Sequence, residues 1–188
     1  MTLEETRAQI DEVDTQIKAL FLKRMELAEQ VAATKKQSGS DVFVPERERS
    51  MIQGESADVP KYLRSEYIAF LKYLTGASRR HQYGMLPEMQ DAVINKALKC
   101  SGLSAQAPHT RIQTSFTCER DSSIFALLIA LANAGGIGIG IGYLHSEADG
   151  ANRLVSMSLI GNVNDPAIRQ LLCQIGKETV DFRITGLA

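Results

Sequence analysis

The first 36 residues constrain the fold more than any other segment of the chain. Residues 3–36 contain neither glycine nor proline, which predicts a single uninterrupted helix. At ~1.5 Å per residue this helix is roughly 50 Å long, far longer than the ~13 Å radius of gyration of a 100-residue domain. Its apolar side chains recur at heptad spacing; they are Leu3, Ile10, Val13, Ile17, Leu20, Leu27 and Val31. Because so long a stripe needs an equally long partner, we expect a homodimer built on a second copy of this helix.

The charge and cysteine content exclude several classes of protein. The 188 residues carry 21 basic and 22 acidic side chains, so no charge surplus favours nucleic acid or an anionic membrane surface. The three cysteines, Cys100, Cys118 and Cys173, show no metal-ligand spacing, and neither a disulfide framework nor a metal site is expected. No apolar run approaches the ~20 residues of a membrane span, and no apolar signal core begins the chain. A reduced cytoplasm is the expected location.

Turn residues divide the rest of the first half into three shorter helices. The run Ser-Gly-Ser-Asp at 38–41 ends the long helix, and Pro45 suits the first turn of a second helix of about two turns. Asp58 is predicted to cap a third helix over about 61–83. A shorter helix over 87–100 then leads into a polar linker.

From residue 111 onward the hydrophobic period changes to that of strands. We predict strands over 111–119, 136–143, 154–160 and 180–185, and helices over 122–134 and 165–177. The order βαββαβ gives a four-stranded sheet with helices on one face, a ferredoxin-like plait. The predicted fold class is α + α/β, with a helical domain over 1–86, a connecting helix and linker over 87–109, and a second domain over 110–188.

Two cations on the long helix are the first candidates for a binding site. Arg24 occupies a heptad position that packing would give to Ile or Leu, where an unpaired charge costs roughly several kcal/mol. Lys35 lies eleven residues further on, nearly on the same stripe and ~16 Å away. Such a pair can hold a small dianion between its side chains. The alternative is an ion pair between subunits for Arg24 and a solvated helix end for Lys35.

Other polar residues indicate a binding site only when they are considered together. Arg47 and Glu48 place a cation beside an anion on the short second helix. Ser78 and Gln82 are four residues apart, so both project from one face of the third helix. Arg7 is the last member of the set. Each alone is as readily explained as a solvated surface residue.

Together these positions carry a resemblance to a known family. The runs LEETRAQIDEVD at 3–14, KRMELAEQV at 23–31, VPERER at 44–49 and ASRRHQ at 77–82 resemble the all-helical class of chorismate mutases. The nearest likeness is to the mutase portion of fused mutase–prephenate dehydrogenases. One departure is Val44, where many relatives carry an acid, so this position would act through its backbone amide.

The resemblance implies the isomerisation of chorismate to prephenate in aromatic amino acid biosynthesis, without metal or other cofactor. It assigns Lys35 and Gln82 to the ether oxygen and Glu48 to the ring hydroxyl. Arg24, Arg47, Ser78 and Arg7 would surround the two carboxylates, and the substrate-binding set is completed by Val44. The chemistry agrees, because a [3,3] rearrangement moves no proton and needs no nucleophile, only a held conformer and stabilised negative charge.

The position of Arg7 adds a geometric expectation. Arg7 and Arg24 lie 17 residues apart on one helix, which places them ~25 Å apart and about 100° out of phase. A molecule the size of chorismate cannot bridge them. If both residues serve one pocket, Arg7 must come from the partner subunit of an intertwined dimer.

The order of elements over 111–187, with the glycine run at 135–138, resembles an ACT domain, the amino-acid-sensing plait of many enzymes of aromatic biosynthesis. The resemblance implies an aromatic amino acid effector near Ser122, Ser123, Gly136, Ile137 and Gly138. The family's Pro-Gly before the first helix is absent here. A structural or dimerising role is the alternative. A dinucleotide site is excluded because no GxGxxG occurs.

Two other functions remain open at this point. An isochorismate pyruvate lyase uses a similar helical pocket for a related elimination, although Glu48 resembles the mutase contact to the ring hydroxyl. A non-catalytic regulatory subunit that senses amino acids is the second, although it would have no need of Arg24 in an apolar stripe.

Overall fold

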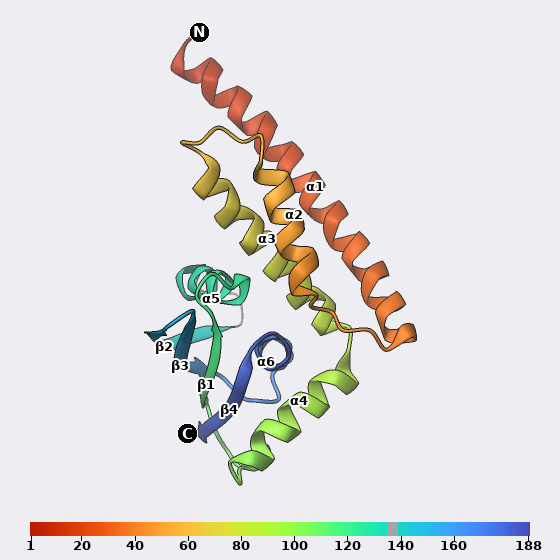
Figure 1. Cartoon of the computed structure of the whole chain (residues 1–188), viewed down its shortest axis with the longest axis vertical. Coiled ribbons are helices and arrows are strands. Elements are labelled where there is room, and N and C mark those ends of the chain that lie inside the picture. The colour runs from red at the N-terminus through yellow and green to blue at the C-terminus, as the bar shows by residue number, and fades with distance from the viewer. Residues whose placement is uncertain (135–138) are drawn as a thin grey trace.

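The structure, a computed structural model, describes residues 1–134 and 139–188. Four helices come first, and a mixed segment of strands and helices follows (Figure 1). In chain order the elements are α1 (Leu3–Ser38), α2 (Pro45–Ser56), α3 (Arg64–Gly84), α4 (Pro87–Cys100), β1 (Arg111–Glu119), α5 (Ser123–Ala134), β2 (Gly140–Asp149), β3 (Asn152–Ile160), α6 (Pro166–Glu178) and β4 (Val180–Leu187).

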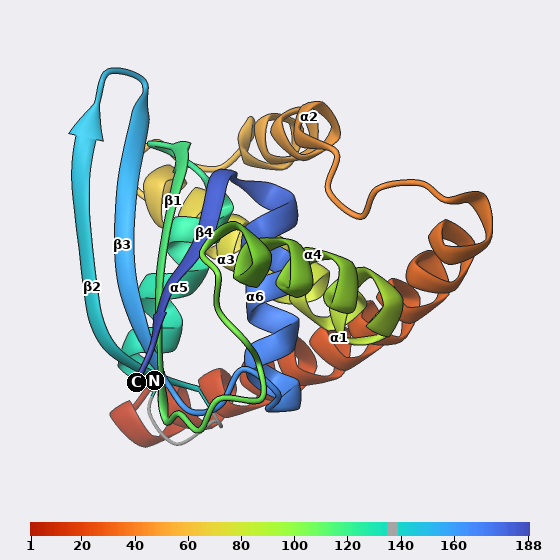
Figure 2. The ribbon, with the colours of Figure 1, turned by 90° about the horizontal axis from the view of Figure 1, so that it is seen from below.

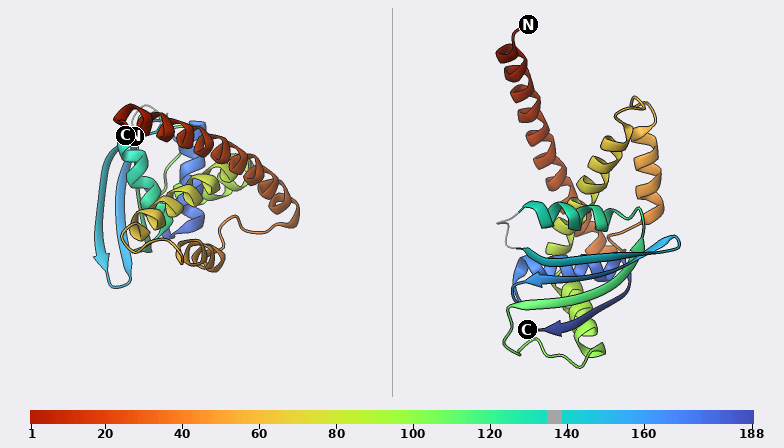
Figure 3. Two further views of the ribbon diagram at one scale, coloured as in Figure 1. Left: turned by 90° about the horizontal axis from the view of Figure 1, so that it is seen from above. Right: turned by 90° about the vertical axis from the view of Figure 1, so that its left-hand side faces the viewer.

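Helix α1 is one unbroken helix, as its sequence predicts. Its first turn is closed by a capping box in which Thr2 and Glu5 each accept a hydrogen bond from the other's backbone N–H. It ends at Gly39, whose φ of 68° is a left-handed conformation that favours glycine. Its N-terminal half projects from the rest of the molecule (Figure 3). Only Ala28 and Ala32 of this helix are buried in the single chain.

Helices α2 and α3 differ in length from the prediction. Helix α2 has 12 residues, about three turns rather than two. Helix α3 begins at Arg64, and Asp58 lies in the preceding turn instead of capping it. The guanidinium of Arg64 donates hydrogen bonds to the carbonyl oxygens of Ala57 and Val59, each at 3.0 Å. That side-chain contact fixes the turn, which local cap rules do not anticipate.

The predicted βαββαβ plait is confirmed over the described residues. The four strands form one antiparallel sheet in the order β2-β3-β1-β4. Strand β1 pairs with β3 from Arg111 opposite Ile160 to Glu119 opposite Asn152. Helices α5 and α6 lie together on one side of the sheet (Figure 2). The strand predicted from Gly136 is described from Gly140 onward.

The two halves of the chain share one packing unit. Helix α3 packs against both α5 and α6, so these two helices lie between the sheet and α3 (Figures 1 and 2). Gly76 of α3 allows this close approach, since a Cβ there would meet the Ser123 carbonyl oxygen and the Leu127 side chain at 3.4 Å. Ile94 and Leu98 of α4 join the same buried core. The mutual position of α3 and the C-terminal half is therefore fixed by core packing.

Among the helices that the structure describes, none combines the length and the apolar character that a membrane crossing requires.

Candidate active site

A cavity of about 390 Å³ lies between α1, the loop that follows it, α2 and α3. This volume falls in the ~300–1,000 Å³ range of small-molecule sites. Of the substrate-binding residues predicted from the sequence, the structure places all but Arg7 on its wall. They are Arg24, Lys35, Val44, Arg47, Glu48, Ser78 and Gln82. Apolar contact surface comes from Leu27, Val31, Phe43 and Met51.

Arg24 is half-buried between α1 and α3. Its Nη1 donates a hydrogen bond of 3.4 Å to the carbonyl oxygen of Leu74. Burial lowers the pKa of Arg24 from its ordinary value, and the nearby positive charge of Arg79 lowers it further. The charge in the apolar stripe thus lies in a partly dehydrated wall, where a ligand anion would be attracted strongly.

Lys35 is held by the loop that closes α1. Its ammonium group donates hydrogen bonds of 2.7 Å to the carbonyl oxygens of Asp41 and Val42. Burial lowers the pKa of Lys35, and Arg47 and Arg79 lower it further, while Asp41 acts in the opposite direction. An ammonium group has three donors, so one remains for a ligand.

Ser78 and Gln82 are both buried on α3, one turn apart. Gln82 Nε2 donates a long hydrogen bond of 3.5 Å to the Ser78 carbonyl oxygen. Within the part of the chain that the structure describes, Gln82 Oε1 has no hydrogen-bond partner. A buried amide oxygen without a partner is costly, and the NH2 and oxygen ends of the amide can exchange by rotation. Gln82 is therefore a polar group that a ligand in the cavity can satisfy.

Arg47 and Glu48 come from the first turn of α2. Arg47 is exposed and lies in the first turn of this helix, on the wall of the cavity. The side chain of Glu48 is 14% exposed and pairs with Arg79. Val44 is the residue that precedes α2, and its carbonyl oxygen accepts the backbone N–H of Glu48. The short loop from Gly39 to Val44 thus contributes Val42, Phe43 and Val44 to the cavity wall, directly before α2.

Sequence reasoning did not identify Arg79, which also lines the cavity. It is 6% exposed, although it belongs to a run of basic residues that is typical of a solvated surface. A signal was available: Arg79 is three residues before Gln82 on α3, and residues at this spacing share a helix face.

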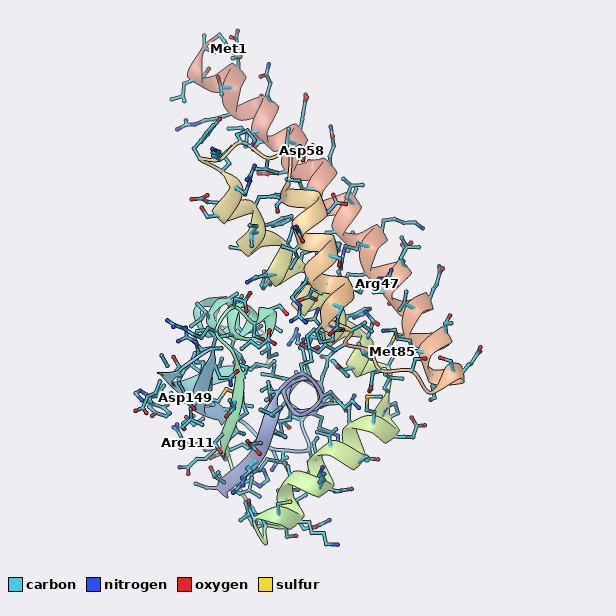
Figure 4. All side chains as sticks on the ribbon, viewed as in Figure 1. Met1, Arg47, Asp58, Met85, Arg111 and Asp149 are labelled. Carbon is cyan, nitrogen blue, oxygen red and sulfur yellow. The ribbon has the colours of Figure 1, made fainter. Side chains whose placement is uncertain are left out.

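The structure does not bring Arg7 to this cavity within one chain. Arg7 is exposed near the start of α1. In Figure 4, Met1 marks that free end of the helix, and Arg47 of the cavity wall lies far from it, on α2. The geometry within a single chain leaves Arg7 and Arg24 apart, as their spacing requires.

The charge of the cavity favours an anion. Arg24, Lys35 and Arg47 are on its wall together with the carboxylate of Glu48, which is already paired with Arg79. Among the described residues, no three His, Cys, Asp or Glu side chains are placed to hold a metal ion. The donor set is one of nitrogen cations and amides, which suits carboxylates.

A second cavity, of about 380 Å³, lies between α2 and the C-terminal half. Two of the predicted effector residues line it. Ser122 Oγ accepts the backbone N–H of Ile124 at 3.3 Å, and Ser123 Oγ accepts a hydrogen bond of 2.6 Å from Arg79. The other predicted effector residues, Gly136, Ile137 and Gly138, lie outside the described residues.

Comparison with known proteins identifies the helical half. The family model for chorismate mutase type II matches residues 6–83. Over these residues the chain is similar to that family. The T-protein of Haemophilus influenzae is 39% identical over 59 residues, which are 31% of this chain and 16% of that protein. No solved structure matches the chain significantly.

The matched segment includes every element that surrounds the first cavity. The match covers most of α1 and all of α2, and it ends one residue before the end of α3. The C-terminal half lies beyond the match. Its antiparallel sheet with two helices on one face is consistent with the ACT-like domain expected from the sequence.

Proposed function

We propose that this protein is a chorismate mutase, which converts chorismate into prephenate. The observation that carries the proposal is the convergence of Arg24, Lys35 and Arg47 with Ser78 and Gln82 on one cavity inside the matched domain. These residues are spread over 59 positions of the chain, and three separate helices bring them together.

The proposed reaction breaks one C–O bond and forms one C–C bond within the same molecule. No proton is transferred, so the protein must hold the reactive conformer and stabilise the charge that develops on the departing ether oxygen. Lys35 and Gln82 would donate hydrogen bonds to that oxygen. Arg24, Arg47 and Ser78 would hold the carboxylates, Val44 would contribute its backbone, and Glu48 would accept the ring hydroxyl.

We further propose that the active form is a homodimer in which the partner's Arg7 completes each pocket. The apolar stripe of α1 supports this proposal, since Ile10, Val13, Ile17 and Leu20 are between 49% and 70% exposed in the single chain. Isolated apolar side chains on a surface are ordinary, but a continuous stripe along a projecting helix is typical of an interface.

A turnover assay with purified protein tests the activity. Chorismate should give prephenate, and isochorismate should give no pyruvate. Lys35→Ala should lower kcat/KM at least ~100-fold, because an ether-oxygen donor is lost. Lys36→Ala is the matched control, since Lys36 is adjacent, lies outside the cavity and makes a surface pair with Glu88. Pyruvate and salicylate from isochorismate would instead identify a lyase, and turnover of neither substrate would favour a binding protein.

Subunit exchange tests the shared pocket. Arg7→Ala and Lys35→Ala proteins should each be inactive, and an equal mixture should regain about a quarter of wild-type activity. Half of the random dimers are then mixed, and each mixed dimer holds one intact pocket. Exchange should be followed with a labelled subunit. Full exchange without recovered activity would contradict a pocket shared between subunits.

The C-terminal half is proposed to regulate the mutase by binding an aromatic amino acid near Ser122 and Ser123. Support comes from the second cavity, which shares Phe43 and Glu48 with the first. Titration with phenylalanine, tyrosine and tryptophan should change KM or kcat for one of them. If calorimetry detects no heat of binding for any of the three amino acids, the C-terminal half has a structural or dimerising role instead.

A further inference from the structure

Arg79 is a buried cation whose partners come from both halves of the chain. Its Nε and Nη2 donate hydrogen bonds of 2.7 and 3.0 Å to the two carboxylate oxygens of Glu178, at the end of α6. Nη2 also donates to Ser123 Oγ, at the start of α5. Nη1 pairs with Glu48 on the mutase side, and the guanidinium stacks over the Phe43 ring at 4.6 Å.

This arrangement uses the planar fork of an arginine. One edge of the guanidinium serves Glu178 and the opposite nitrogen serves Glu48, which a lysine ammonium cannot reproduce. The side chain of Glu178 is 1% exposed, so its negative charge depends on Arg79 for compensation. Gln174 also helps to hold the Glu178 carboxylate in place. Its Nε2 donates hydrogen bonds to Glu178 Oε1 at 3.2 Å and to the Gly76 carbonyl oxygen at 2.9 Å. The network therefore joins α6 to α3 and to α2.

Arg79 also separates the two cavities. Its partners Phe43, Glu48, Ser123 and Glu178 all line the second cavity. Arg79 itself lines the first cavity together with Phe43 and Glu48. Glu178 at the end of α6 is thus connected to Glu48 through one side chain, that of Arg79.

We infer that Arg79 is a positioning residue for Glu48, held in place by Glu178 and Ser123 of the C-terminal half. The inference rests on the proposed mutase function, because Glu48 is assigned there to the ring hydroxyl. It makes the C-terminal half part of the apparatus that shapes the pocket. Loosening Glu178 from Arg79 would release the guanidinium and allow Glu48 to leave its position.

Two conservative variants test the positioning role. Glu178→Gln keeps the shape of the side chain but removes the charge and replaces one acceptor by a donor. Arg79→Lys keeps the charge but removes the fork. In each, kcat should fall about tenfold while KM changes less than about threefold, since small displacements of a reactive group lower the rate more than binding. Rates are normalised to folded protein, so that a purely structural role would leave them unchanged.

A double-mutant cycle identifies Glu48 as the residue through which Glu178 acts. In a Glu48→Gln background, Glu178→Gln should lower kcat less than about twofold, because the two changes act on one guanidinium. Arg169→Met is the matched control: Arg169 also joins α6 to the helical half, through Asp91, and lies outside both cavities. This variant should leave kcat and KM unchanged. Equal tenfold losses with and without Glu48, or wild-type kinetics in Arg79→Lys, would overturn the inference.

The same cycle followed by thermal unfolding keeps the two proposals distinguishable. Glu48→Gln and Glu178→Gln should shift Tm non-additively whether or not the protein turns over chorismate. An inactive wild-type protein with this coupling would refute the mutase function and leave the Arg79 connection in place. Additive Tm shifts would refute the connection itself.

Discussion

At the scale of single residues, the free pocket concentrates positive charge. Burial lowers the pKa of both Arg24 and Lys35, and the nearby charge of Arg79 lowers each of them further. Arg47 acts on Lys35 in the same direction. This mutual repulsion is relieved when a dianion occupies the cavity. The pocket is therefore arranged so that ligand binding and the charging of its cations reinforce each other.

This coupling predicts the pH dependence of the proposed mutase reaction. The pKa of Lys35 is lowered from 10.5, so the free protein loses the Lys35 proton at a lower pH than an ordinary lysine does. Because the charged form is needed, kcat/KM should fall as pH rises through this lowered pKa. A bound dianion raises the same pKa, so kcat should fall only at higher pH. Profiles of kcat/KM and kcat from about pH 6 to about pH 11 show whether the alkaline fall in kcat/KM comes at a lower pH than the fall in kcat.

Lys35→Arg provides the control for that assignment. An arginine stays charged throughout this pH range, so the alkaline fall in kcat/KM should disappear while the rate at neutral pH is reduced. An unchanged alkaline limb in this variant would assign the titration to another group.

Single residues also mark the limit of prediction from sequence. Arg24, Lys35, Ser78 and Gln82 could be found because their partners in the pocket lie at helical spacings, which the sequence displays directly. For Arg79 the spacing to Gln82 indicates a shared helix face, but it does not reveal that the guanidinium is buried against the C-terminal half. Its partners Glu178 and Ser123 are 99 and 44 positions away in the chain, and their proximity depends on how α5 and α6 pack on α3. Only the tertiary structure provides that distance.

At the scale of elements, periodicity and turn residues account for most boundaries. The strand over 111–119 and the long first helix follow from pattern alone, and Gly39 marks the helix end. The start of α3 does not follow, because the turn before it is held by Arg64 through its side chain and no cap residue is used. Local rules succeed where the chain satisfies its own backbone, and fail where a side chain from outside the turn does so.

The end of α1 gives a prediction with a matched pair of glycines. Gly39→Ala should destabilise the protein by about 1 kcal/mol, because an alanine in the left-handed conformation is strained. Gly54 lies within α2, and a Cβ added at either glycine would meet no atom within 4 Å. Gly54→Ala should therefore stabilise the protein by about 0.5 kcal/mol, since alanine favours the helix. Urea unfolding at one fixed protein concentration compares the two, and equal effects would contradict the assignment.

At the scale of the whole molecule, the C-terminal half is packed against α3, whereas the N-terminal half of α1 has few contacts within the chain. Helix α3 lies against α5 and α6, so the helical half and the C-terminal half share buried contacts. The N-terminal half of α1 diverges from these layers (Figure 3). The proposed dimer and the Arg79 network thus act on opposite sides of one pocket: the partner's Arg7 would arrive from α1, and the C-terminal half acts through α6.

The last prediction concerns assembly. Val13 and Ile17 are 53% and 49% exposed on the apolar stripe, and replacing both by Asp places charges in the proposed interface. Each apolar side chain buried there contributes roughly 1.5–3 kcal/mol, so the dimer dissociation constant should rise at least ~100-fold. Mutase activity should fall in parallel, because the partner's Arg7 is lost from each pocket. Sedimentation velocity across a concentration series measures the first effect, and the chorismate assay measures the second.

Leu22→Asp is the matched control for this variant. Leu22 is 56% exposed on the same helix, but at about 100° per residue it faces the side opposite to the stripe. It should leave both assembly and activity near wild type. If Leu22→Asp dissociates the dimer as strongly, the interface is not the heptad stripe. If the Val13 and Ile17 variant sediments as a single chain and remains fully active, Arg7 has no role across subunits, and each pocket is complete within one chain.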